Sequence, residues 1–195
     1  LIYVSTMFKV DEAGRKRLRR DVNECWKKIY HILGKSKERI LLDDEFLVTH
    51  FMLYFASNIQ ELEKERYRRY YDDFGEWQSN YLLNDYFVVQ KISDNSLLIE
   101  DCFNYIQSLS ECIDFWGDIK NPLSSKYEDE VKEYIDKINF LAVYSRRNYR
   151  HRFMVDYPYL NVFLLACFKA CKDNPKTLLN FLKILEKYMF VVEFY

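Results

Sequence analysis

Apolar residues recur three or four positions apart through most of this chain, the spacing that is typical of amphipathic helices. Only four glycines and three prolines occur in 195 residues, so few positions oppose helix formation. The sequence therefore predicts an all-α fold, an irregular multi-helix bundle. The predicted helices span residues 15–33, 44–55, 97–116, 125–144, 159–172 and 176–190.

The first predicted helix has a broad apolar face that we expect to be buried. That face comprises Leu18, Val22, Cys25, Trp26, Ile29, Tyr30, Ile32 and Leu33. Later in the chain, Asn121-Pro122 interrupts the helical pattern. The length fits either a single helical domain over residues 1–195, with a weak subdivision near 121–122, or two packed helical subdomains. Because the chain begins with Leu1 and ends on an apolar stretch, we expect a fragment of a longer protein.

The charge and the cysteine content bound the environment of the protein. The formal net charge is −1, so any nucleic-acid binding needs a local basic patch. Five cysteines without a disulfide-like spacing, and no signal peptide, predict a reduced, cytoplasmic protein. No apolar run approaches the roughly 20 residues of a membrane helix, so no membrane association is expected.

The residue types that carry enzyme chemistry are present but scattered. His31, His50 and His151 do not share metal-ligand spacing, and we expect lone histidines to be packed and hydrogen-bonded. Cys167 and Cys171 lie one helical turn apart, but a soft metal needs further ligands, so a core role is favoured. No glycine-rich phosphate loop occurs. We therefore predict no catalytic residue, no metal site and no cofactor in this chain.

Three basic clusters remain as candidates for nucleic-acid contact. The first opens the first predicted helix, and the second lies at residues 66–69 among acidic residues that neutralise it. The third has no acidic residue between Lys137 and Asp156, and its arginines alternate with aromatic rings suited to base stacking. We take the third as the best candidate, against the alternatives of a solvated face or a domain-docking surface. Its residues are Arg146, Arg147, Arg150 and Arg152.

Several segments, in this order, resemble the helical middle region of the GmrSD-type proteins, which are modification-dependent (type IV) restriction systems of bacteria. The resemblance covers about residues 20–190, and its motifs are helical packing signatures. The segments that carry it are NECWKKIYHIL at 23–33, DDEFLVTHF at 43–51, YIQSL at 105–109 followed by Trp116, Ile119, Asn121 and Pro122, YPYL at 157–160 with LLA at 164–166, and ILEKYMF at 184–190.

The family combines an N-terminal half, with an Asp-Gly-Gln-Gln-Arg motif linked to nucleotide hydrolysis, and a C-terminal half with an HNH-type nuclease motif. Neither motif occurs here, and Val191 stands where an arginine commonly follows Met-Phe in the family. The resemblance thus implies a non-catalytic linker domain that couples the two halves of a nucleotide-dependent DNA endonuclease. Its expected partners are those flanking domains, DNA and, in an oligomer, a second copy.

Two other functions compete with this interpretation. A stand-alone helical module could bind a partner protein through its aromatic-rich surfaces. A helical enzyme is the third alternative, which the lack of any convergent acid, base, nucleophile or metal set makes the weakest.

Overall fold

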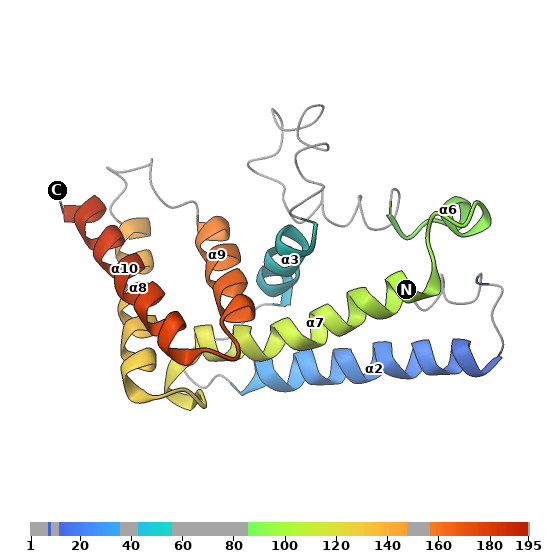
Figure 1. Ribbon diagram of the computed structural model, residues 1–195, viewed down its shortest axis with the longest axis horizontal. Coiled ribbons are helices and arrows are strands. Elements are labelled where there is room, and N and C mark those ends of the chain that lie inside the picture. Colours follow the sequence, from blue (N-terminus) through green and yellow to red (C-terminus); the bar gives the residue numbers. More distant parts are fainter. Residues whose placement is uncertain (1–7, 9–11, 36–42, 56–85, 148–156, 195) are drawn as a thin grey trace, which may run out of the picture. The chain divides into compact units, whose positions relative to one another are not determined.

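The structure is a computed structural model that describes residues 8, 12–35, 43–55, 86–147 and 157–194. Every regular element in these ranges is a helix (Figure 1), which confirms the predicted all-α fold. The elements are α2 (Glu12–Gly34), α3 (Asp43–Tyr54), α6 (Val89–Ser93), α7 (Ile99–Lys120), the 3-10 helix η3 (Pro122–Ser124), α8 (Asp129–Arg147), α9 (Tyr157–Ala170) and α10 (Pro175–Phe194).

The six predicted helices correspond to α2, α3, α7, α8, α9 and α10, with differences at their ends. Helix α7 continues past the predicted end at Trp116 to Lys120 because Ile119, one turn further on, is fully buried. The short helix α6 was not predicted. A turn follows it, in which Asn95 adopts a positive φ of 58°, a conformation that asparagine tolerates better than most residues.

The chain divides into two compact units, residues 1–113 and 114–195, and the division falls within α7. The break at Asn121-Pro122 lies inside the second unit, directly after α7 ends. None of the helices in the described ranges is both long enough and apolar enough to cross a bilayer.

In the first unit, α2 and the first part of α7 run side by side in the same direction. The Sγ atom of Cys25 lies 3.7 Å from the carbonyl oxygen of Ile106, and Lys28 Nζ donates a 2.6 Å hydrogen bond to that of Ser110. The buried residues of α2 form a single row along this contact, spaced four and three residues apart. They are Leu18, Val22, Cys25, Ile29 and Leu33.

Helix α3 completes the core of the first unit and is buried on most of its circumference. Its side chains meet an aromatic cluster centred on Tyr105 of α7, whose ring lies 5.0 Å from Tyr54, 5.4 Å from Phe87 and 5.3 Å from His50. Edge-to-face pairs of this kind add to the free energy of burial. Burial raises the pKa of the Tyr105 hydroxyl far above its usual range.

In the second unit, α8 and α10 pack side by side (Figure 1). Lys183 of α10 forms a 2.6 Å ion pair with Glu130 of α8 at the edge of this contact. The C-terminal end of α7 is held by two side-chain hydrogen bonds. Asn139 Nδ2 donates to the carbonyl oxygen of Ile119 at 2.8 Å, and Lys120 Nζ donates to Asn161 Oδ1 at 3.0 Å.

Candidate nucleic-acid interface

Helix α2 carries a strong excess of positive charge. Its sequence contains seven lysines and arginines and three carboxylates, a net charge of +4, whereas the whole chain has a net charge of −1. Because the buried row described above occupies one side of the helix, most of these charged side chains have to face outward. This helix holds the first of the three basic clusters in the sequence.

Two of the seven cations are engaged in holding α2 against α7. The guanidinium carbon of Arg17 lies 4.9 Å above the ring of Phe103, a cation–π contact. Lys28 Nζ hydrogen-bonds the carbonyl oxygen of Ser110, as noted above, and reaches its hydroxyl at 3.5 Å. We assign these two side chains to the packing of the unit.

The side chain of Arg17 nevertheless remains 67% exposed, and Arg15 is half-buried. The other four cations are also exposed, and we call Lys16, Arg19, Arg20 and Lys27 the basic face. The side chains of Lys16, Arg20 and Lys27 remain 73%, 69% and 72% exposed although each lies near a carboxylate. Solvent-exposed ion pairs of this kind contribute little to stability, so a phosphate can replace the carboxylate at small cost.

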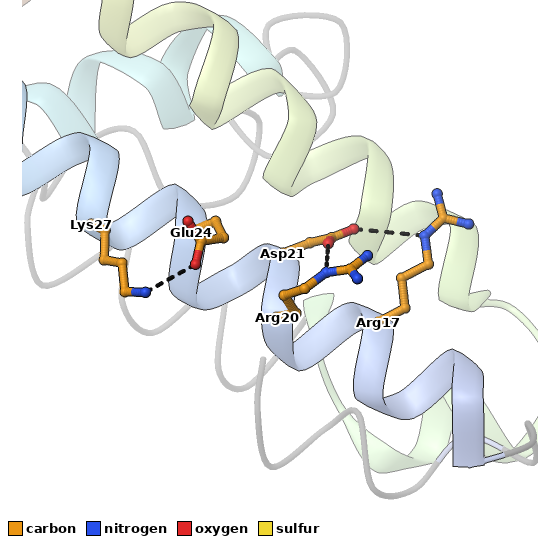
Figure 2. Close-up of polar contacts among 5 residues, drawn as sticks. All are labelled: Arg17, Arg20, Asp21, Glu24 and Lys27. Atoms are coloured by element: carbon orange, nitrogen blue, oxygen red, sulfur yellow. Dashed lines mark hydrogen bonds and ion pairs between the residues drawn. The ribbon is translucent and has the colours of Figure 1, made fainter.

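The ion pairs of α2 join residues three or four positions apart, except for Arg20 and Asp21, which are adjacent (Figure 2). Lys27 Nζ lies 2.9 Å from a carboxylate oxygen of Glu24. Asp21 forms ion pairs with both Arg20 and Arg17, whose Nε atoms lie 3.4 and 3.7 Å from its carboxylate oxygens. One turn earlier, Lys16 Nζ lies 2.8 Å from Glu12. Arg19 takes part in none of these pairs, and the described part of the chain contains no carboxylate within ion-pair distance of it.

Two aromatic residues of α2 lie outside the core, contrary to the prediction. Trp26 is half-buried and Tyr30 is 60% exposed, although both were assigned to the buried face. Each lies one position beyond a residue of the buried row, so its side chain is rotated by about 100° away from the contact with α7. The two rings stack on each other, with centroids 5.8 Å apart and planes inclined by 28°.

The arginines that the sequence analysis favoured are only partly described. Arg146 and Arg147 lie in the last turn of α8, where the structure describes the backbone but not these two side chains. Arg150 and Arg152 lie outside the described residues, as does the basic cluster at residues 66–69. The first cluster, on α2, is the one whose surroundings the structure describes in detail.

The buried polar groups of the first unit have structural roles. His50 Nε2 lies 3.0 Å from Ser108 Oγ, but His50 is fully buried and Ser108 nearly so, which leaves no access for a substrate. This confirms that His50 is packed and hydrogen-bonded. The same prediction is wrong for His31, which is exposed because it points away from the buried row, and His151 lies outside the described residues.

The cysteines have the environments of unreactive thiols. Burial raises the pKa of Cys25 to about 11 and that of Cys102 to about 12. Cys167 and Cys171 are half-buried, and desolvation raises the pKa of Cys167 to about 11. Within the described ranges, no group of three histidine, cysteine or acidic side chains is arranged to hold a metal ion.

Comparisons of the chain with protein-family models, with curated proteins and with solved structures gave no match.

Arg17 contacts Phe103 of α7, whereas Arg19 takes part in none of the ion pairs of α2, so replacing the two residues should affect stability differently. Replacement of Arg17 by alanine should lower the free energy of unfolding by roughly 1 kcal/mol, because it removes the contact with Phe103 and the pair with Asp21. Replacement of Arg19 by alanine should change it by less than about 0.5 kcal/mol. Urea denaturation of both variants measures the difference, and equal losses would contradict the assignment of Arg17 to the packing.

Proposed function

We propose that this chain is a non-catalytic helical domain that contacts DNA and couples the two active halves of a GmrSD-like, nucleotide-dependent restriction protein. The observation that supports DNA contact is the exposed basic face of α2, in a chain whose overall charge is slightly negative. The coupling role follows from the resemblance of residues 20–190 to the middle region of that family.

The arrangement of the basic face suits a nucleic-acid backbone. Lys16 and Lys27 are eleven residues apart, which corresponds to about 16 Å along a helix axis, so the four cations can meet several successive phosphates. Each phosphate that a cation neutralises releases condensed counterions, and this entropy gain drives binding at low salt. The exposed carboxylates that now pair with Lys16, Arg20 and Lys27 hold them only weakly.

Charge reversal tests the DNA contact. The combined substitutions Lys16→Glu, Arg19→Glu and Arg20→Glu should weaken binding to duplex DNA roughly 100-fold at physiological salt, and should reduce the steepness of the salt dependence by about three phosphate contacts. Fluorescence anisotropy over a series of salt concentrations measures both quantities.

A matched control carries the same change of net charge in the second unit. Lys126, Lys176 and Lys187 are all exposed there, and their replacement by glutamate should leave the affinity within a few-fold of the unaltered protein. If the control loses as much affinity as the α2 variant, the basic face is not the contact. The variant with Arg146, Arg147 and Arg150 changed to glutamate tests the other basic cluster in the same assay.

The coupling role has a separate test at the level of the gene. Sequencing of the source locus on both sides of this segment should find an encoded Asp-Gly-Gln-Gln-Arg motif upstream and an HNH-type motif downstream in the same reading frame. A locus that lacks both motifs would contradict the coupling role and leave the DNA contact to be judged from the binding measurements.

A protein-interaction module is the second candidate, and an exposed apolar row on α10 favours it. Ile184, Tyr188 and Val191 are 68%, 56% and 54% exposed and recur at spacings of four and three. This row is separate from the buried row of the same helix, formed by Leu178, Leu182, Leu185 and Met189. Spacings of four and three are those of a coiled-coil seam, so another helix could cover the exposed row.

Substitutions on α10 test this second candidate. A tagged chain should retain a binding protein from host extract, and Ile184→Glu combined with Tyr188→Glu should abolish that retention because two charges would be buried in the contact. Asn180→Glu combined with Lys187→Glu, at exposed positions beside the row, serves as the control and should retain the partner. A chain that stays monomeric and recovers no partner would contradict the module.

A further inference from the structure

The aromatic pair of α2 lies in line with an exposed arginine. Arg19, Asn23, Trp26 and Tyr30 recur at spacings of four, three and four residues, which places them along one side of the helix. Lys16, Arg20 and Lys27 follow a neighbouring row on the outward side of the helix. Stacked rings and a row of cations thus lie next to each other on the same exposed surface.

We propose that this surface binds single-stranded DNA, with phosphates along the basic face and an unpaired base stacked on the Trp26–Tyr30 pair. The proposal rests on the DNA contact proposed above, and it adds a physical reason for a preference for single-stranded over duplex DNA. Cationic side chains beside exposed aromatic rings are the combination by which proteins hold unpaired strands without sequence preference.

The geometry of the pair suits a base. The indole of Trp26, itself half-buried, packs against Tyr30 and fixes the orientation of the phenol ring, while Tyr30 remains 60% exposed. A base that adds to such a stack extends it by one ring and requires little reordering of the protein. Asn23 and Arg19, one and two turns earlier on the same side, can reach the neighbouring sugar and phosphate.

Charge alone would not produce a preference for a single strand. Duplex DNA has the higher charge density, so a purely cationic surface binds it at least as well. In a duplex, each base face is covered by its neighbours, and the rings of α2 have no face to contact. A preference for unpaired DNA therefore has to come from Trp26 and Tyr30.

The experiment compares a fluorescein-labelled 15-residue oligothymidylate with a duplex carrying the same number of phosphates, both titrated with the complete chain. Tyr30→Ala should weaken binding of the single strand by roughly 5- to 150-fold and change duplex binding by less than about twofold. Tyr30→Phe preserves the ring and should bind both as the unaltered protein does. His31→Ala, at the adjacent exposed position, is the control for local disturbance of the helix.

Tryptophan emission gives a second measurement at the stack itself. Binding of the oligothymidylate should quench part of the emission, and the quenched part should be lost in Trp26→Phe. Both proteins are measured in a Trp77→Phe background, because Trp77 lies outside the described residues, whereas Trp116 is fully buried. Since Trp26 is half-buried, a Trp26→Ala variant could unfold the chain. Tyr30→Ala and the quenching difference therefore provide the evidence in that case.

The outcomes distinguish the stacking site from the DNA contact of the basic face. If the chain binds neither form of DNA, the DNA contact and the stacking site are both wrong, and the coupling role is judged from the locus. If the chain binds both forms and Tyr30→Ala changes neither affinity, the stacking site is wrong and the DNA contact of the basic face remains. If Tyr30→Ala lowers both affinities by the same factor, the rings have a structural role and the stacking site is again wrong.

Discussion

Burial of a single row of apolar residues along α2 determines which of its charged side chains meet the solvent. The row from Leu18 to Leu33 is buried with about one residue per turn, and Cys25 and Lys28 reach backbone oxygens of α7 along it. The remaining side chains of the helix take their direction from that buried row. Residues at the flanks of the row, such as Arg17 and Lys28, can reach atoms of α7 and become part of the packing. Residues on the far side, such as Lys16 and Lys27, meet solvent and carboxylates of α2 itself.

The periodicity of the sequence was sufficient to predict the six longer helices, but not α6, in which no residue is buried. It was not sufficient to predict the width of each stripe. Tyr30 was assigned to the broad apolar face of α2 that we expected to be buried, yet it is exposed. The width of a buried stripe depends on how many neighbouring helices contact it, and this is a tertiary property that the local pattern does not contain.

The sequence also did not predict which cations of α2 contact α7. Arg17 and Arg19 are two residues apart and chemically identical, and one lies over Phe103 while the other has no carboxylate near it in the described part of the chain. The residue that distinguishes them is Phe103 of α7, which contacts Arg17 and lies more than eighty residues later in the sequence. Basic clusters were visible in the sequence, but which arginine is available to a ligand depends on long-range contacts. For the cluster at residues 146–152, the corresponding contacts lie largely outside the described residues.

The outward sides of α2 and α10 differ in composition. Both helices bury one apolar row. Outside that row, α2 carries charged side chains and the Trp26–Tyr30 pair, whereas α10 carries a second apolar row. The carboxylates Glu12, Asp21 and Glu24 keep most of the cations of α2 paired in the free protein, which reduces the repulsion among like charges on one helix. A phosphate that displaces such a carboxylate exchanges one exposed pair for another, so the gain comes mainly from released counterions and falls with salt. A stacked ring does not depend on salt in this way. The basic face and the aromatic pair therefore contribute to binding through separable physical effects, which is why affinity and strand preference can be measured independently on one helix.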